Sequence, residues 1–119
     1  MIREAMTEVA EYITDLGLDA DVCTGPLDAS NALANGRCTV VVPPPALTGL
    51  TLTTTEFEFK TIVASPYQDL ERDTDELEVL LDQLMHSQLS PTTAEPNVFQ
   101  AFDGQSYACY VLTHTTYSD

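Results

Sequence analysis

Apolar residues recur along this chain at helical spacings in two places. Over residues 2–16 they fall three and four positions apart, which predicts an amphipathic helix that ends at Gly17. A second stripe spans 77–85, and Asp73 followed by Glu76 predicts a capping box at the start of that helix. The apolar positions of the two stripes are Ile2, Met6, Val9, Ile13, Leu16, Leu77, Leu80, Leu81, Leu84 and Met85.

Strands are predicted where β-branched residues cluster or where apolar and polar residues alternate. Two short strands at 19–24 and 37–42 precede a longer one at 50–64. Leu50 and Leu52 in this segment have even numbers, whereas the apolar residues from Phe57 onward have odd numbers, so a bulge or turn is expected near 53–55. The small, polar stretch 25–36 is predicted to be a loop. The alternation in the long strand predicts a buried face of Phe57, Phe59, Thr61 and Val63 and a wet face of Glu56, Glu58, Lys60 and Ile62.

The end of the chain reads as a hairpin. Strands at about 97–102 and 105–116 flank Asp103-Gly104, a dipeptide typical of two-residue hairpin turns. The order of elements is therefore α-β-β-β-α-β-β. We predict an α+β fold in a single domain covering 1–119, with a mixed, mainly antiparallel sheet of about five strands and two helices packed on one face.

The predicted hairpin has apolar residues on both faces, with Phe99 opposite Ala108. Two helices of about four turns each can cover only one face of a five-stranded sheet, so the other face is expected to meet a neighbouring subunit. The alternative is that the stretches 25–36 and 43–53 cover it. The residues expected at the subunit interface are Val98, Phe99, Phe102, Tyr107 and Tyr110.

Charge narrows the range of partners. Nineteen Asp and Glu residues face four Lys and Arg, which gives a net charge of -15, although the hydrophobic content of 44% is ordinary for a globular protein. Four scattered cations do not make a basic patch for nucleic acid or for an anionic membrane. An acidic chain can instead bind a basic partner, mimic nucleic acid or repel DNA that passes near it.

The cysteines and the hydropathy of the chain indicate the cellular compartment in which the protein is expected. Cys23, Cys38 and Cys109 are an odd number without a CxxC pair, so we expect buried, reduced thiols. The first thirteen residues lack the apolar core of a signal peptide, and no apolar run approaches the roughly 20 residues of a membrane helix. We therefore expect a cytosolic protein that does not enter a membrane.

Candidate residues for catalysis or metal binding are few. His86 and His114 lack a Cys or Asp partner at triad spacing, and both are expected at the surface or at a helix end. The acids in 69–78 can chelate calcium, but an EF-hand loop there would need Gly and Glu where Thr74 and Leu80 stand. Carboxylate pairs for glycosidase-type chemistry stay open, because nothing in the sequence positions them. We predict a protein that is not an enzyme, with no catalytic residue, no metal site and no cofactor.

The layout nevertheless resembles a known family. A helix, a strand and a polar loop lead to an apolar strand that runs into three prolines at 38–45. A long strand ending at 64–66, an amphipathic helix and a closing strand at 107–113 complete it. This resembles the tail-terminator proteins of long-tailed bacteriophages, particularly those infecting actinobacteria. The resemblance in layout extends over nearly the whole chain. Only the strand before the prolines and the closing strand resemble sequence motifs of the family.

The resemblance implies a structural role in the virion neck. Tail terminators form a six-membered ring on the head-proximal end of the tail tube, stop its polymerisation and join it to the head connector. The implied partners are further copies of the chain, the tail tube protein and the head–tail connector proteins. The ring would assemble in the host cytoplasm, need no cofactor, and let viral DNA pass without specific binding.

An acid-lined lumen would repel the phosphates of passing DNA. Glu56 and Glu58 on the wet strand face and the stretch 25–36 are the candidates to line it. Two other functions stay open from the sequence: another neck subunit, such as a head-closure or tail-completion protein, and an acidic DNA-mimic inhibitor. An enzyme is a third and weaker alternative.

Overall fold

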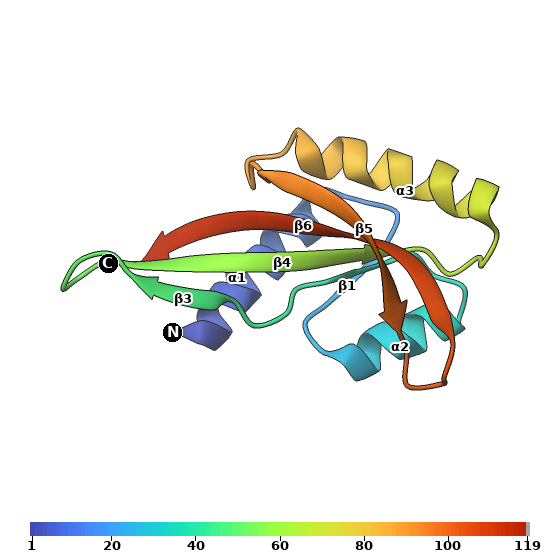
Figure 1. Cartoon of the computed structure of the whole chain (residues 1–119), viewed down its shortest axis with the longest axis horizontal. Helices are drawn as coiled ribbons and strands as arrows, with labels where there is room; N and C mark the ends of the chain where they lie inside the picture. Colours follow the sequence, from blue (N-terminus) through green and yellow to red (C-terminus); the bar gives the residue numbers. More distant parts are fainter. Residues whose placement is uncertain (119) are drawn as a thin grey trace.

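The computed structural model describes residues 1–118, without the side chain of Ser118. These residues form three helices and six strands in an α+β fold (Figure 1). The elements are α1 (Ile2–Asp15), β1 (Asp21–Cys23), α2 (Pro26–Ala34), β2 (Thr39–Val41), β3 (Ala46–Gly49), β4 (Thr55–Ala64), α3 (Leu70–Met85), β5 (Thr93–Gln100) and β6 (Ser106–Ser118).

The sheet is built around the long strand β4. The strand order is β1-β2-β4-β6-β5, and all pairs except the parallel β1–β2 pair are antiparallel. One edge of β4 pairs with β6 over its whole length, from Thr55 to Ala64. Its other edge is shared, because β3 pairs with residues 55–58 and β2 with residues 62–64. The sheet is therefore wide at one end and narrow at the other.

Helices α1 and α3 lie on one face of the sheet, as the sequence predicts for its two helices. Val9 and Ile13 of α1 and the leucines of α3 pack with Phe57, Phe59 and Val63 of β4. The odd-numbered residues from Phe57 to Val63 are buried while Glu56, Glu58, Lys60 and Ile62 are partly or fully exposed, which confirms the predicted alternation. Each face of β4 thus has a different environment.

The stretch 25–36 is not a loop, so that prediction is wrong. Residues 26–34 form α2, which begins with Pro26 at its first position, where the missing N–H costs nothing. Ala29 and Leu33, four residues apart, are buried. Leu33 packs in a smaller cluster on the other face of the sheet. The Pro, Asp, Ser and Asn residues predict a loop, but burial of Ala29 and Leu33 on one side of the segment favours a helix.

The segment predicted as one strand over 50–64 is a hairpin. Residues 50–54 form the turn between β3 and β4, closed by the Leu50 N–H donating to the Thr54 carbonyl at 3.0 Å. A turn near this position was predicted, whereas β3 was not. Because Leu50 and Leu52 lie in the turn, their opposite parity needs no bulge.

The final hairpin has a different register from the predicted one. Phe99 pairs with Tyr107 rather than with Ala108, and residues 101–105 form the loop. Asp103 explains the longer loop, since its carboxylate accepts from the Gln105 N–H at 2.8 Å and from the Tyr107 hydroxyl at 3.2 Å. A shift of one residue exchanges the faces of a strand. The predicted pairing of apolar faces is therefore wrong for β5.

The start of α3 also differs from the prediction. Asp69, not Asp73, is the N-cap, and its carboxylate accepts from the N–H groups of the residues two and three positions ahead. Asp73 is buried and accepts from the Ser65 hydroxyl at 2.6 Å and from the Tyr67 N–H at 3.1 Å. It ties the first turn of α3 to the end of β4.

Replacement of Asp73 by Ala should lower the free energy of unfolding by about 1–3 kcal/mol, because the buried Ser65 hydroxyl loses its acceptor. Urea denaturation measures the change. Asp75→Ala, at an exposed site on the same helix, is the matched control and should change it by no more than about 0.5 kcal/mol. Equal effects of the two substitutions would contradict the role given to Asp73.

Candidate assembly surface

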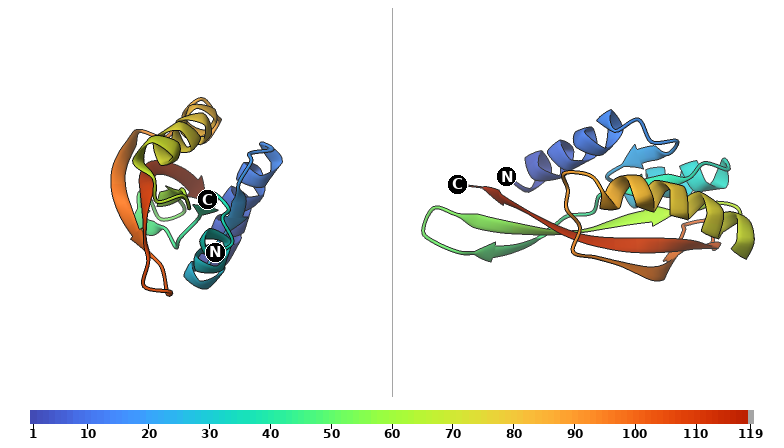
Figure 2. Two further views of the ribbon diagram at one scale, coloured as in Figure 1. Left: turned by 90° about the vertical axis from the view of Figure 1, so that its right-hand side faces the viewer. Right: turned by 90° about the horizontal axis from the view of Figure 1, so that it is seen from above.

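A hairpin arm projects from one end of the molecule. We call residues 46–58, which comprise β3, the turn at 50–54 and the first part of β4, the arm. Its tip extends past all three helices along the longest axis (Figure 1; Figure 2, right), in a molecule that measures 48 × 28 × 23 Å. In the sheet, the β4 part of the arm pairs with β6, and β3 pairs with β4 alone, so one edge of β3 has no strand beside it among residues 1–118.

The outer part of the arm is apolar and uncharged. Leu50 is 51% exposed and Leu52 is fully exposed, while Leu47 in β3 is 41% exposed. Residues 38–55 contain no charged side chain, and no other stretch of this length in the chain lacks charge. In a chain of net charge -15, the outer part of the arm, residues 46–55, is thus a surface that can approach another acidic molecule without placing carboxylates against each other.

A groove of about 580 Å³ opens between α3 and the strands β6 and β5, of which β5 is at the edge of the sheet. Its lining is apolar toward the sheet, while carboxylates of α3 lie along it. Leu70 and Met85, at opposite ends of α3, are 84% and 36% exposed. The lining includes Leu70, Leu77, Leu81, Met85, Pro96, Ala108 and Tyr110, together with the acids Asp73, Glu78 and Asp82.

The five residues predicted at a subunit interface are not all at the surface. Val98 is 58% and Phe102 is 68% exposed, whereas Phe99 and Tyr110 are half-buried. Tyr110 lines the groove beside α3. Tyr107 is buried in the smaller cluster of this chain's own core, so its side chain is not available to a partner, which corrects that choice. Leu33 of α2 belongs to the same cluster, so the helix that was predicted as a loop helps to bury Tyr107.

The two acids predicted to line a lumen lie on the wet face of the sheet. Glu56 is in register with Tyr117 and Glu58 with Thr115, and both acids are partly exposed. Glu95 of β5 points to the same side of the sheet, because it pairs with Val111 of β6, and Val111 pairs with Ile62 of β4. The Nζ atom of Lys60 lies 3.9 Å from Glu58. Glu56, Glu58 and Glu95 lie with Lys60 on the open part of this face, while α2 covers its other end near Asp21. Both α1 and α3 lie on the opposite side.

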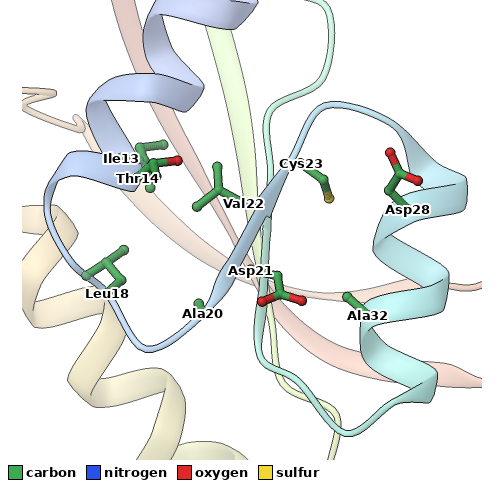
Figure 3. Close-up of a pocket in the computed structure, with 9 residues that line it drawn as sticks. All are labelled: Ile13, Thr14, Leu18, Ala20, Asp21, Val22, Cys23, Asp28 and Ala32. Carbon is green, nitrogen blue, oxygen red and sulfur yellow. The ribbon is translucent and has the colours of Figure 1, made fainter.

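The other predicted lumen candidate, the stretch 25–36, is the helix α2. It brings one acid, Asp28, to a pocket beside the edge strand β1, together with Asp21 and Cys23 (Figure 3). Arg37 binds Asp21 there, with its Nη2 atom 3.1 Å from the carboxylate. Burial, and then the charges of Asp28 and Asp21, raise the pKa of the Cys23 thiol to about 11.

A thiol with such a pKa is protonated at neutral pH and is a poor nucleophile. Burial also raises the pKa of Cys109 to about 11 and, with the charge of Glu76, raises that of Cys38. Within residues 1–118, no group of three or more His, Cys, Asp and Glu side chains is placed to hold a metal ion. The pocket of Figure 3 therefore offers cysteine chemistry little support.

The prediction that His114 is at the surface is wrong. It is fully buried, with its ring stacked on Phe59 at 5.3 Å between centroids and its Nε2 atom 2.7 Å from the Thr61 hydroxyl. Its Nδ1 atom is buried without a hydrogen-bond partner, and burial lowers its pKa to about 4. The parity of β6 could have found it, because His114 is two residues from the buried Leu112.

His86, by contrast, lies exposed at the end of α3, as predicted. Its Nδ1 atom is 2.8 Å from the carbonyl oxygen of Asp82 and 3.4 Å from the carboxylate of the same residue. Asp82 stands one helical turn before the histidine, a spacing by which the sequence alone could have identified this partner. Two exposed side chains of this kind give no enclosed site for catalysis.

Comparison with known proteins adds no family. No protein-family model matches the chain, and no curated protein matches it significantly. In the described part of the chain, none of the helices combines the length and the apolar character that crossing a membrane requires. The functional interpretation therefore depends on the surfaces described above.

Titration of His114 should make stability depend on pH. Its pKa is about 4 in the folded chain and near 6.5 when unfolded, so the unfolded state binds more protons between these values. Stability should fall as the pH is lowered through this window, by roughly 3 kcal/mol from this residue. Urea unfolding at pH 7 and pH 4 measures the loss, and His114→Gln should reduce it.

His86→Gln, the same substitution at an exposed histidine, controls for the change in composition and should leave the pH dependence unaltered. The three proteins contain the same carboxylates, so the difference between proteins reports on the histidine. If His114→Gln lost as much stability as the unsubstituted chain over this window, a neutral buried His114 would be disproved.

Proposed function

We propose that this chain is a structural virion protein that forms a ring on the end of a phage tail tube, ends the polymerisation of the tube and joins the tail to the head connector. The observation that carries the proposal is the wet, acidic sheet face of Glu56, Glu58 and Glu95, which lies opposite α1 and α3. A face of this kind suits the lining of a channel that conducts DNA.

The electrostatic argument is simple. DNA must cross the ring without being held, and a lumen lined with carboxylates repels its phosphates. Lys60, the cation beside these glutamates, lies close to Glu58, which offsets its attraction for phosphate. The net charge of -15 on each copy adds to the repulsion when copies are joined in a ring.

Assembly is supported by the projecting arm and by the exposed apolar side chains Val98 and Phe102. Subunits joined through different patches form a ring when the rotation between them closes. The proposed partners are further copies of the chain, six in the ring by analogy with tail terminators, the tail tube protein and the head connector. Another neck subunit, such as a head-closure or tail-completion protein, would use the same surfaces.

One observation favours a different class of function. The exposed acids Glu71, Asp75, Glu78 and Asp82 lie four, three and four residues apart, so they form one row along α3. A row of carboxylates can imitate the phosphates of a DNA strand and would make the chain an inhibitor of a DNA-binding protein. A DNA mimic acts as a monomer or dimer bound to its target, whereas a ring subunit assembles with itself.

Reversal of charge on the wet face tests the proposed lumen. In the phage that encodes the chain, Glu56→Lys with Glu58→Lys should leave DNA retained in the tail and should slow genome ejection, because lysines in the channel would hold phosphates. Plaque counts and ejection kinetics measure the effect. We expect a loss of infectivity of at least about tenfold, which corresponds to about 1.4 kcal/mol in the barrier to passage.

Glu4→Lys with Glu11→Lys is the matched control, since it makes the same change of charge on exposed positions of α1, on the other side of the sheet. This control should leave ejection unchanged. Normal infectivity of the Glu56/Glu58 variant would contradict a lumen lined by this face. Equal defects in both variants would show an effect of net charge alone and would likewise contradict it.

A further inference from the structure

We propose that the tip of the arm, at Leu50 and Leu52, docks into the groove beside α3 of a second copy of this chain. The inference rests on the proposed ring, and it names the contact that joins neighbouring copies. Each copy would then offer one arm and one groove. The contact explains two features that a single chain leaves open, an exposed apolar tip and an open apolar groove.

The positions of the two surfaces exclude docking within one chain. The tip of the arm lies at one end of the longest axis, and α3 lies over the other half of the molecule (Figure 1; Figure 2, right). An arm held in the sheet by its pairing with β6 cannot fold back across that distance. A groove filled by an arm is therefore filled by the arm of another copy.

The two surfaces match in chemistry. Leu52 is fully exposed and Leu50 half exposed, and the groove presents Leu70, Leu81 and Met85 to receive them. Burial of apolar side chains from both partners favours association. The turn and its flanks also carry threonine hydroxyl groups, which donate hydrogen bonds, and the carboxylates of α3 along the groove accept them.

Charge favours a second copy as the occupant. Two chains of net charge -15 repel each other, and like charges placed in contact oppose binding. The groove carries Asp73, Glu78 and Asp82, so a segment of this chain that enters it without repulsion must lack carboxylates. The tip of the arm meets this condition, because it lies within the uncharged stretch 38–55.

The contact joins different patches on the two partners, so it is heterologous. Such a contact leaves a free arm on one subunit and a free groove on the other, and it propagates until a ring closes. A two-fold dimer with exchanged arms would stop at two copies. The proposal is the heterologous, propagating form.

Crosslinking between the two surfaces tests the contact. In a Cys23→Ala background, which removes the half-buried thiol, the double variant Leu52→Cys with Met85→Cys is treated with a short bis-maleimide. Denaturing gels should show a ladder of covalent oligomers longer than a dimer. Each single variant should give no ladder, and an equal mixture of the two single variants should give covalent dimers.

The matched control pairs Leu52→Cys with Leu27→Cys, which places the second thiol on α2 at a leucine that is 58% exposed. It should give no ladder. Similarly, Leu52→Asp should reduce the native mass to that of a monomer, whereas Leu27→Asp should leave it unchanged. Both aspartate variants should still unfold cooperatively in urea, because each side chain is exposed in the single chain and neither substitution removes a core contact.

The outcomes separate this contact from the proposed function. Oligomers that form without the ladder and survive Leu52→Asp would overturn the docking and leave the ring function standing. A ladder that stops at dimers would overturn the heterologous form, and a monomeric chain without crosslinks would overturn the contact altogether. A full ladder in a phage whose Glu56/Glu58 variant ejects DNA normally would support the docking and contradict the lumen.

Discussion

The pairing of β4 with β6 is the constraint on which the other elements depend. It runs for ten residues, from Thr55 opposite Ser118 to Ala64 opposite Cys109. Since this register fixes which residues face each side, it places Phe57, Phe59 and Leu112 under α1 and α3. The same register turns the glutamates of β4 toward the opposite side. A one-residue slip would exchange the two faces, so the apolar core and the acidic face specify each other.

The sharing of the second edge of β4 gives the molecule its shape. Beside residues 62–64 the sheet continues into β2 and β1. Helix α2 contacts both of these strands, and α1 contacts β1 (Figure 3). Beside residues 55–58 it continues only into β3, so this end is a narrow arm. Residues 46–55 of the arm include exposed leucines and no charged side chain, whereas Glu56 and Glu58 lie at its base and the three helices carry most of the other acids. This polarity along the long axis underlies the proposed head-to-tail assembly.

The sequence predicted those features that depend on periodicity. The alternation over 56–63, the stripe of α1 and the leucines of α3 sufficed for the two-helix face and the α+β class. The prediction from the sequence is wrong where a local arrangement of hydrogen bonds sets the length of a loop. Asp103 extends the last loop by accepting from Gln105 and Tyr107, and this moved the register of β5.

At other positions the sequence prediction is wrong because packing against distant elements determines the structure. A helix of nine residues with Pro, Asp, Ser and Asn looks like a loop until its buried Ala29 and Leu33 are seen against the sheet. The lack of a Cys or Asp partner predicts a surface position for His114, although its parity places it in the buried row next to Phe59. Of the surface residues, Glu56 and Glu58 lie on the wet face as expected, whereas Tyr107 is interior. The groove and the arm need three dimensions, because each combines elements distant in sequence.

The native mass of the purified chain, together with negative-stain microscopy, tests the central claim most directly. The account predicts a closed assembly of six copies of the 13.0-kDa chain, seen as rings with six-fold symmetry and a central opening. A chain that stays monomeric at micromolar concentration, or that copurifies as a monomer with a host DNA-binding protein, would contradict the ring and favour the DNA mimic.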